Sequence, residues 1–157
     1  MAGQINYVDG VKFPASHVPS ADANMLDDYE EGPWTPVLGG SGGQTGQTHS
    51  VQSGIYVKIG RLVVCNFRVA LSAKGTITGN LQISGLPFAA SVQAGISIGF
   101  PYKFTLTAGH HLLGQVAAAS QVITFFETDY TGDSPAALSE ANIGTDSEIS
   151  GTVSYQV

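Results

Sequence analysis

The paired histidines and a short acidic run are the residues whose types suit metal or acid–base chemistry. His110 and His111 are adjacent, and neighbouring residues of a strand point to opposite faces, so one chain cannot offer both to one metal ion. One of them could act as a ligand on a threefold axis, but a surface turn after Gly109 is the simpler interpretation. The acidic run over residues 27–31 lacks the separation across a cleft that two glycosidase carboxylates need. We therefore expect no metal, no cofactor and no catalytic carboxylate pair.

Two glycine motifs match catalytic or phosphate-binding patterns in sequence but not in context. Residues 95–99 read Gly-Ile-Ser-Ile-Gly, but the nucleophile elbow with this pattern needs a strand followed by a helix, and this serine lies in a β-type run. The glycine-rich tract over residues 39–46 lacks the Gly-Lys-Ser/Thr ending of a phosphate loop, and we expect a loop there that is either mobile or held by a neighbour. The single Cys65 lies in an apolar run and is expected to be a small buried side chain. These patterns predict a protein that is not an enzyme.

Aromatic and polar side chains near turn signals are the candidates for contact with a sugar. An aromatic ring packs against the apolar face of a sugar while nearby polar groups bind its hydroxyls. The candidate ligand-binding residues fall in three turns and are Tyr102, His110, His111, Asp129 and Tyr130. Ordinary turns without a ligand are the alternative interpretation of the same residues.

The composition excludes several classes of function. Charged residues make up 11% of the chain, against about 25% in an average protein. The net charge is −6 and no Lys or Arg follows Lys103, so the clustered cations that bind nucleic acid are missing. No apolar stretch reaches the roughly 18 residues of a membrane span, and no signal peptide is recognisable. We expect a protein made in a reducing cytoplasm, with no membrane insertion and no nucleic-acid partner.

The spacing of apolar residues and turns predicts an antiparallel all-β fold, a β-sandwich or barrel, preceded by an extended leader. We expect the leader over residues 1–32, with one or two helical turns allowed at 22–31, and the β-domain over 33–157. Residues 50–59 and 61–71 predict a hairpin, with Val51, Ile55, Val57 and Ile59 on one face. Further short strands are expected near residues 34–38, 81–83, 96–100, 102–106, 112–118, 122–127 and 149–157. The expected structural residues are Trp34, held between two prolines, and Leu26 and Tyr29 of the leader.

Several segments resemble the C-terminal domains of phage tail fibres and tailspikes. The family shows F-P-A followed by N-T-L-D-D-Y-E-E-G-T-W-T-P, and residues 13–15 and 24–36 are similar to these motifs. Residues 54–61 are similar to the G-x-Y-x-K-I-G strand of the family, and residues 83–88 are similar to its I-S-G-L-P-F segment. Residues 149–155 also resemble the closing segment of the family. Met25 and Pro33 stand where the family has threonine.

The resemblance implies a homotrimeric virion protein of the tail with a β-sandwich or jelly-roll fold, synthesised in the host cytoplasm. It implies a module that trimerises the fibre, joins the rest of the tail fibre and attaches to host cell-surface polysaccharide or lipopolysaccharide. Two alternatives remain at this point: a glycan-degrading tailspike component, and a trimerisation clamp without a ligand. The resemblance does not transfer receptor residues, because the exposed loops differ among members. Nor does it show whether the chain is a fragment, an internal translation product or a separate gene product.

Overall fold

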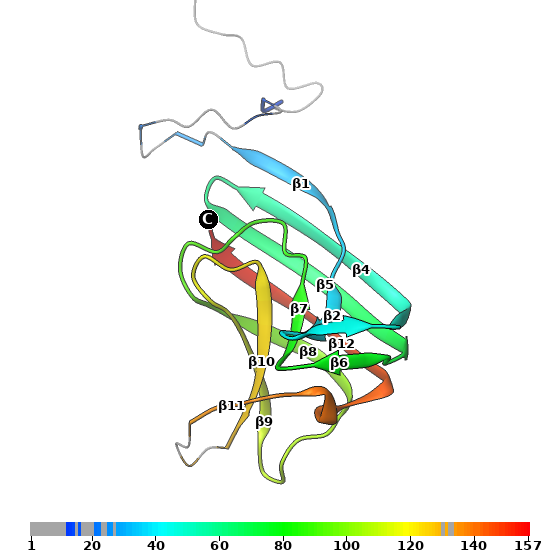
Figure 1. Ribbon diagram of the computed structural model, residues 1–157. Helices are drawn as coiled ribbons and strands as arrows, with labels where there is room; N and C mark the ends of the chain where they lie inside the picture. The colour runs from blue at the N-terminus through cyan, green and yellow to red at the C-terminus, as the bar shows by residue number, and fades with distance from the viewer. Residues whose placement is uncertain are drawn as a thin grey trace, which may run out of the picture.

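The structure, a computed structural model, describes residues 12–14, 16, 21–22, 25–26, 28–129, 131 and 134–157. Antiparallel strands make up most of this part of the chain (Figure 1), and its single helical segment is the 3₁₀ turn η1 (Glu140–Asn142). The strands are β1 (Tyr29–Trp34), β2 (Val37–Gly40), β3 (Gly43–Thr45), β4 (Thr48–Ile59), β5 (Leu62–Ala73), β6 (Thr76–Thr78), β7 (Leu81–Ser84), β8 (Ala94–Phe104), β9 (His111–Val116), β10 (Val122–Thr128), β11 (Ala136–Ala137) and β12 (Ile143–Gln156). The predicted all-β fold is confirmed.

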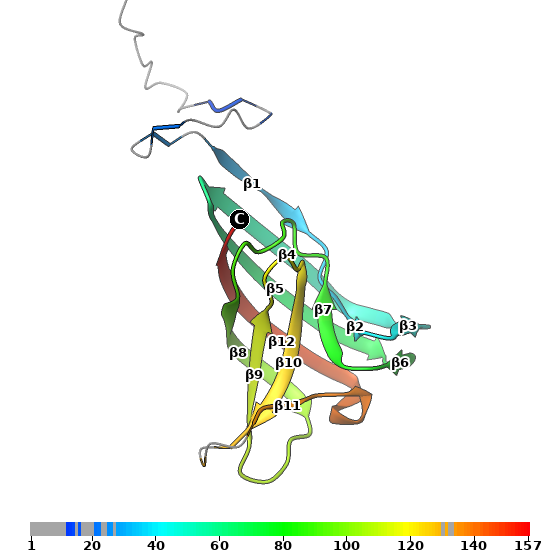
Figure 2. The ribbon, with the colours of Figure 1, turned by 60° about the vertical axis from the view of Figure 1, so that its left-hand side comes forward.

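One long sheet curls back on itself to form the core. Its strand order is β1-β4-β5-β12-β8-β9-β10-β7-β2, while β11 pairs with β10, and β3 and β6 form a separate small sheet. The strand β8 pairs with β12 along most of its length and with β9 at Ala94 and Gly95. We call β1, β4, β5, β12 and β8 the β5 layer, and β9, β10, β7 and β2 the β10 layer. Figures 1 and 2 show the two layers facing each other.

The core consists of apolar side chains from both layers. The β5 layer contributes Val63, Phe67, Val69, Ile149 and Val153, and the β10 layer contributes Leu38, Leu81, Ile83, Ile123 and Phe125. These side chains follow the period of two that a half-buried strand requires. Trp34 closes the core near β1, is 7% exposed and donates from Nε1 to the Asn66 carbonyl oxygen at 3.2 Å.

Two local predictions were wrong, and long-range contacts explain both. The tract at 39–46 forms parts of β2 and β3 instead of a loop. Its glycines permit close packing, because a Cβ on Gly40 would lie 2.1 Å from the Thr78 carbonyl oxygen. The helical turns allowed at 22–31 do not form at residues 29–31, which begin β1 and pair with β4. Residues 23, 24 and 27 of this segment lie outside the described residues.

Candidate functional site

The segments that carry the family resemblance meet at one corner of the fold. Asp28 and Lys58 form an ion pair in which each residue is 7% exposed. The Lys58 Nζ also lies 5.5 Å from the centroid of the Phe88 ring. Next to this pair, the Tyr56 hydroxyl donates to the Glu30 carboxylate, and the Tyr56 ring meets Phe88 edge-on at 5.5 Å. Side chains before β1, on β4 and after β7 therefore hold one another in place.

The titrating groups of this corner are suited to structure and not to catalysis. The hydrogen bond to the Glu30 carboxylate, followed by burial, raises the pKa of Tyr56 to about 12, so its hydroxyl stays a donor at neutral pH. Burial raises the pKa of the neighbouring Cys65 thiol to about 11. A thiol with this pKa carries very little of the thiolate that a nucleophile needs. Cys65 thus lies buried beneath the corner, as its apolar sequence context predicts.

The strand β4 turns its apolar face away from the core. Its inward positions are occupied by Gly54, Tyr56 and Lys58, because the Trp34 ring fills the space that a Cβ on Gly54 would need, with Nε1 only 2.5 Å from that position. The alternating residues Ile55, Val57 and Ile59 therefore point outward and are 60%, 36% and 46% exposed. The sequence predicted that these residues share a face, but not that this face points away from the core.

This exposed face continues onto β5 and toward the leader. Leu62 is 45% exposed and pairs directly with Ile59. We call Ile55, Val57, Ile59 and Leu62 the outer apolar face. Tyr29, on β1, pairs with Ile59 from the other side and is 40% exposed, and Met25 and Leu26 of the leader are 58% and 53% exposed. Large adjoining apolar patches of this kind are typical of interaction surfaces. Sequence reasoning placed Leu26 and Tyr29 as structural residues, and both lie largely exposed in the single chain.

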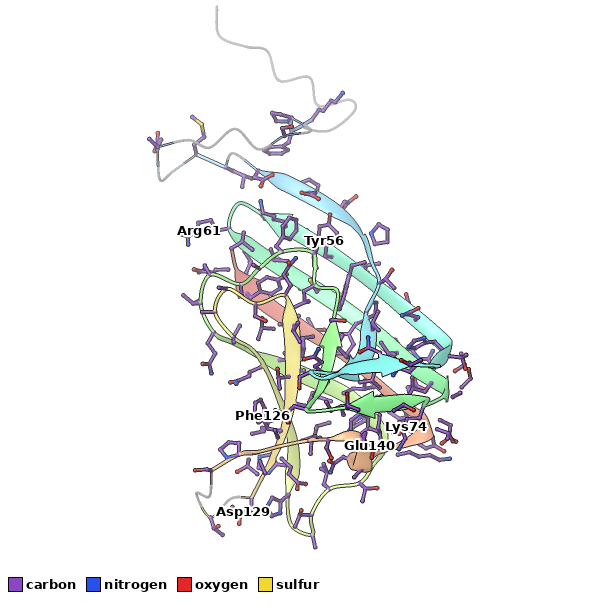
Figure 3. The ribbon with its side chains drawn as sticks, in the orientation of Figure 1. Tyr56, Arg61, Lys74, Phe126, Asp129 and Glu140 are labelled. Carbon is purple, nitrogen blue, oxygen red and sulfur yellow. The ribbon has the colours of Figure 1, made fainter. Side chains whose placement is uncertain are left out.

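Three of the five predicted sugar-contact residues lie together at the end of the molecule away from the leader. His111 opens β9 and pairs with Thr128, the last residue of β10, and Asp129 follows at once. His110 precedes β9 in the same loop, and Figure 3 shows Asp129 at this end. Tyr130 lies outside the described residues. These loops therefore lie at the end of the molecule opposite β1 and the described leader residues (Figure 3).

A hydrogen-bonded carboxylate stiffens the loop before β9. The backbone N–H and the hydroxyl of Thr107 both donate to Glu127, at 2.8 and 2.7 Å. These bonds favour the ionised carboxylate and lower the pKa of Glu127. The Glu127 carboxylate therefore holds the loop through hydrogen bonds, and its lowered pKa makes it a poor general acid.

Tyr102 does not join this group. It lies on β8 in the β5 layer, opposite Glu148 of β12. Its ring is 46% exposed and stacks on Phe100, with 6.1 Å between centroids and 8° between planes. The Lys103 Nζ lies 5.4 Å from the Tyr102 centroid and pairs with Asp146. The four described residues of the five therefore lie on two sets of elements, Tyr102 on β8 and the other three beside β9 and β10.

No metal site or membrane-spanning helix occurs in the part of the chain that the structure describes. Among those residues, no three of His, Cys, Asp and Glu are arranged to hold an ion. None of the described helical segments has the length and apolar character to cross a bilayer.

Comparison with known proteins identifies a shared fold. No protein-family model matches the chain, and no curated protein does. A solved structure matches with a TM-score of 0.63: the crystal structure of the Dettilon tailspike protein (gp208). The chain shares its fold with part of a tailspike. The match is 21% identical in sequence and covers 82% of this chain and 24% of the tailspike chain. At this identity the likeness concerns the fold alone, and the chain spans about a quarter of the tailspike's length.

Proposed function

We propose that this chain is a structural and attachment module of a phage tail, which assembles as a homotrimer and contacts a glycan of the host surface. The outer apolar face carries the proposal. Its four large aliphatic side chains, Ile55, Val57, Ile59 and Leu62, are exposed on adjacent strands of one sheet. The shared fold with part of a tailspike and the resemblance of the β1 and β4 segments support the assignment to a tail.

The apolar chemistry of this face supports association of copies through it. Burial of apolar surface contributes roughly 25 cal/mol per Å², and none of the four side chains carries a charge that would oppose it. Because Met25 and Leu26 are also exposed and lie toward the same end, the leader would extend the contact between copies. In a homotrimer with a threefold axis, the outer apolar faces of the three copies would all point to that axis and meet there.

The proposed partners are two further copies, the rest of the tail fibre and a host polysaccharide or lipopolysaccharide. The place of action is the virion tail, after synthesis in the host cytoplasm. Contact with the glycan is proposed for the end that carries His110, His111 and Asp129. Tyr130, which lies outside the described residues, and Tyr102 are further candidates. Asp28, Glu30 and Glu31 line a groove of about 490 Å³. We nevertheless expect no hydrolysis of the glycan, because Asp28 is paired with Lys58, and Glu30 and Glu31 accept hydrogen bonds from Tyr56 and Tyr29.

Light scattering of the purified chain and two variants tests the assembly. Ile55→Arg places a charge in the outer apolar face, and Val92→Arg makes the same change at a residue that is 54% exposed outside it. We expect a trimer mass for the parent and for Val92→Arg, and a monomer mass for Ile55→Arg at micromolar concentration. Circular dichroism shows whether each variant keeps its strands. A parent of monomer mass, or an Ile55→Arg trimer as stable as the parent, contradicts the proposal.

A further inference from the structure

A shallow groove crosses the outer surface where β8, β9 and β10 run side by side. Its volume is about 400 Å³, within the roughly 300–1,000 Å³ of small-ligand sites. The described residues that line it are Gln93, Gly95, Leu113, Gly114, Gln115, Phe126 and Pro135. Figure 3 shows Phe126 on β10, in the layer opposite the outer apolar face. The groove therefore stays open when copies associate through that face.

The strand register separates the groove into an apolar side and a polar side. Leu113 of β9 pairs with Phe126 of β10, and Pro135 borders them from the turn before β11. Gln115, which lies two residues after Leu113 on β9, pairs with Gly95 of β8. Because residues two apart on a strand share a face, Leu113 and Gln115 both point into the groove.

The polar side offers neutral donors and acceptors. Gln93 Nε2 donates to Gln115 Oε1 at 2.7 Å. This bond orients the two amides and leaves the Gln93 oxygen as an acceptor and the Gln115 nitrogen as a donor. Among the described lining residues none is charged, so the groove suits a ligand without charge. Gly95 creates the opening, since a Cβ there would meet no atom within 4 Å.

The geometry points to a binding site for a neutral sugar unit of a surface polysaccharide. The C–H face of a pyranose ring is apolar and covers Leu113, Phe126 and Pro135, while the hydroxyls at its edge bind the paired amides of Gln93 and Gln115. Anionic sugars are disfavoured, because the described lining offers no cation to compensate their desolvation. This inference rests on the proposed glycan contact and adds a sugar class. It places one sugar unit further along β9 and β10 than His111 and Asp129, beside Leu113 and Phe126 of the same strand pair.

Filling the groove at Gly95 tests the inference. Gly95→Leu adds a side chain in open space and does not strain the backbone, because Gly95 has no positive φ. Gly99→Leu is the matched control on the same strand, where a Cβ would lie an ordinary 3.7 Å from its nearest neighbour, the Ser150 carbonyl oxygen. Gln115→Ala removes the oriented amide, and Tyr102→Ala tests the alternative location. Thermal melting and solution mass are measured for all four variants.

The probes are oligosaccharides built from glucose, galactose, mannose, rhamnose and N-acetylglucosamine, and an anionic set that contains sialic acid or uronic acids. We expect the parent to bind neutral probes, and Gly95→Leu and Gln115→Ala to weaken binding about tenfold or more, equivalent to about 1.4 kcal/mol. Gly99→Leu should bind like the parent, and Tyr102→Ala should weaken binding less than either groove variant.

Three results overturn the inference and differ in what they say of the proposed function. If the parent binds neutral probes and both groove variants bind equally well, the groove is not the site, while the glycan function stands. If only anionic probes bind, the sugar class is wrong. If the parent binds neither set, the inference and the proposed glycan contact both fail.

Discussion

Replacing Lys58 by methionine tests the buried ion pair that ties the start of β1 to β4. The Lys58 and Asp28 side chains are 9% and 10% exposed. Removing one partner of a buried pair costs about 3–5 kcal/mol, because the remaining charge stays buried without compensation. Lys58→Met keeps most of the aliphatic volume but loses the attraction to Asp28 and the cation–π contact with Phe88. We therefore expect the free energy of unfolding to fall by about 3–5 kcal/mol.

An exposed ion pair provides the comparison. Lys103 and Asp146 are 46% and 54% exposed, and solvent-exposed pairs contribute only about 0–1 kcal/mol. Urea unfolding of the parent, Lys58→Met and Lys103→Met is measured at one protomer concentration, since association alters apparent stability. The double variant Asp28→Leu/Lys58→Met removes both charges and should lose less than the two single changes together. Equal losses in Lys58→Met and Lys103→Met would refute the reasoning that burial of the charge determines the cost.

Three further predictions concern the same corner. Trp34→Ala should lower the free energy of unfolding by about 3–5 kcal/mol. Because Trp34 is the only tryptophan, the fluorescence emission maximum of the parent should be that of a buried indole. An emission maximum typical of indole in water would contradict this. Tyr56 should ionise near pH 12 in a tyrosinate titration, above the ordinary pKa of 10.0. Because the pKa is raised in the folded state, the hydrogen bond to Glu30 contributes its full stabilisation below pH 10. That contribution is lost as the pH rises through about 12. Tyr56→Phe should lack this step, and a parent titration with every tyrosine near pH 10 opposes it. Cys65 should react with a thiol reagent only in urea, because burial raises its pKa to about 11; fast labelling of the folded chain argues against it.

The hairpin of β4 and β5 could be predicted from local sequence. Alternation of apolar residues gives the strands, and Gly60 at the turn adopts a positive φ of 56°, which glycine tolerates at little cost. The same alternation did not reveal which face is buried. Tertiary packing decides it, because Trp34 needs the space at Gly54 and Asp28 needs Lys58 on the inner side.

The glycine tract and the candidate sites depended on contacts between distant segments. The local sequence around Gly40 predicts a loop. In the structure, the missing side chain of Gly40 lets β2 approach the Thr78 carbonyl oxygen, nearly forty positions further along the chain. The groove combines Gln93, Gln115 and Phe126 from different segments, and no spacing along the chain marks them as neighbours.

The sequence by itself determined the all-β class, the main hairpin and the apolar character of one face of β4. These depend on backbone propensity and a period of two, which act over a few residues. Only the tertiary structure decided that this face points outward, that the residues after Asp28 form a strand, and that Tyr102 lies apart from His110 and Asp129. The physical reason is that strand pairing, ion pairing and close packing are satisfied between segments whose separation in sequence carries no local signal.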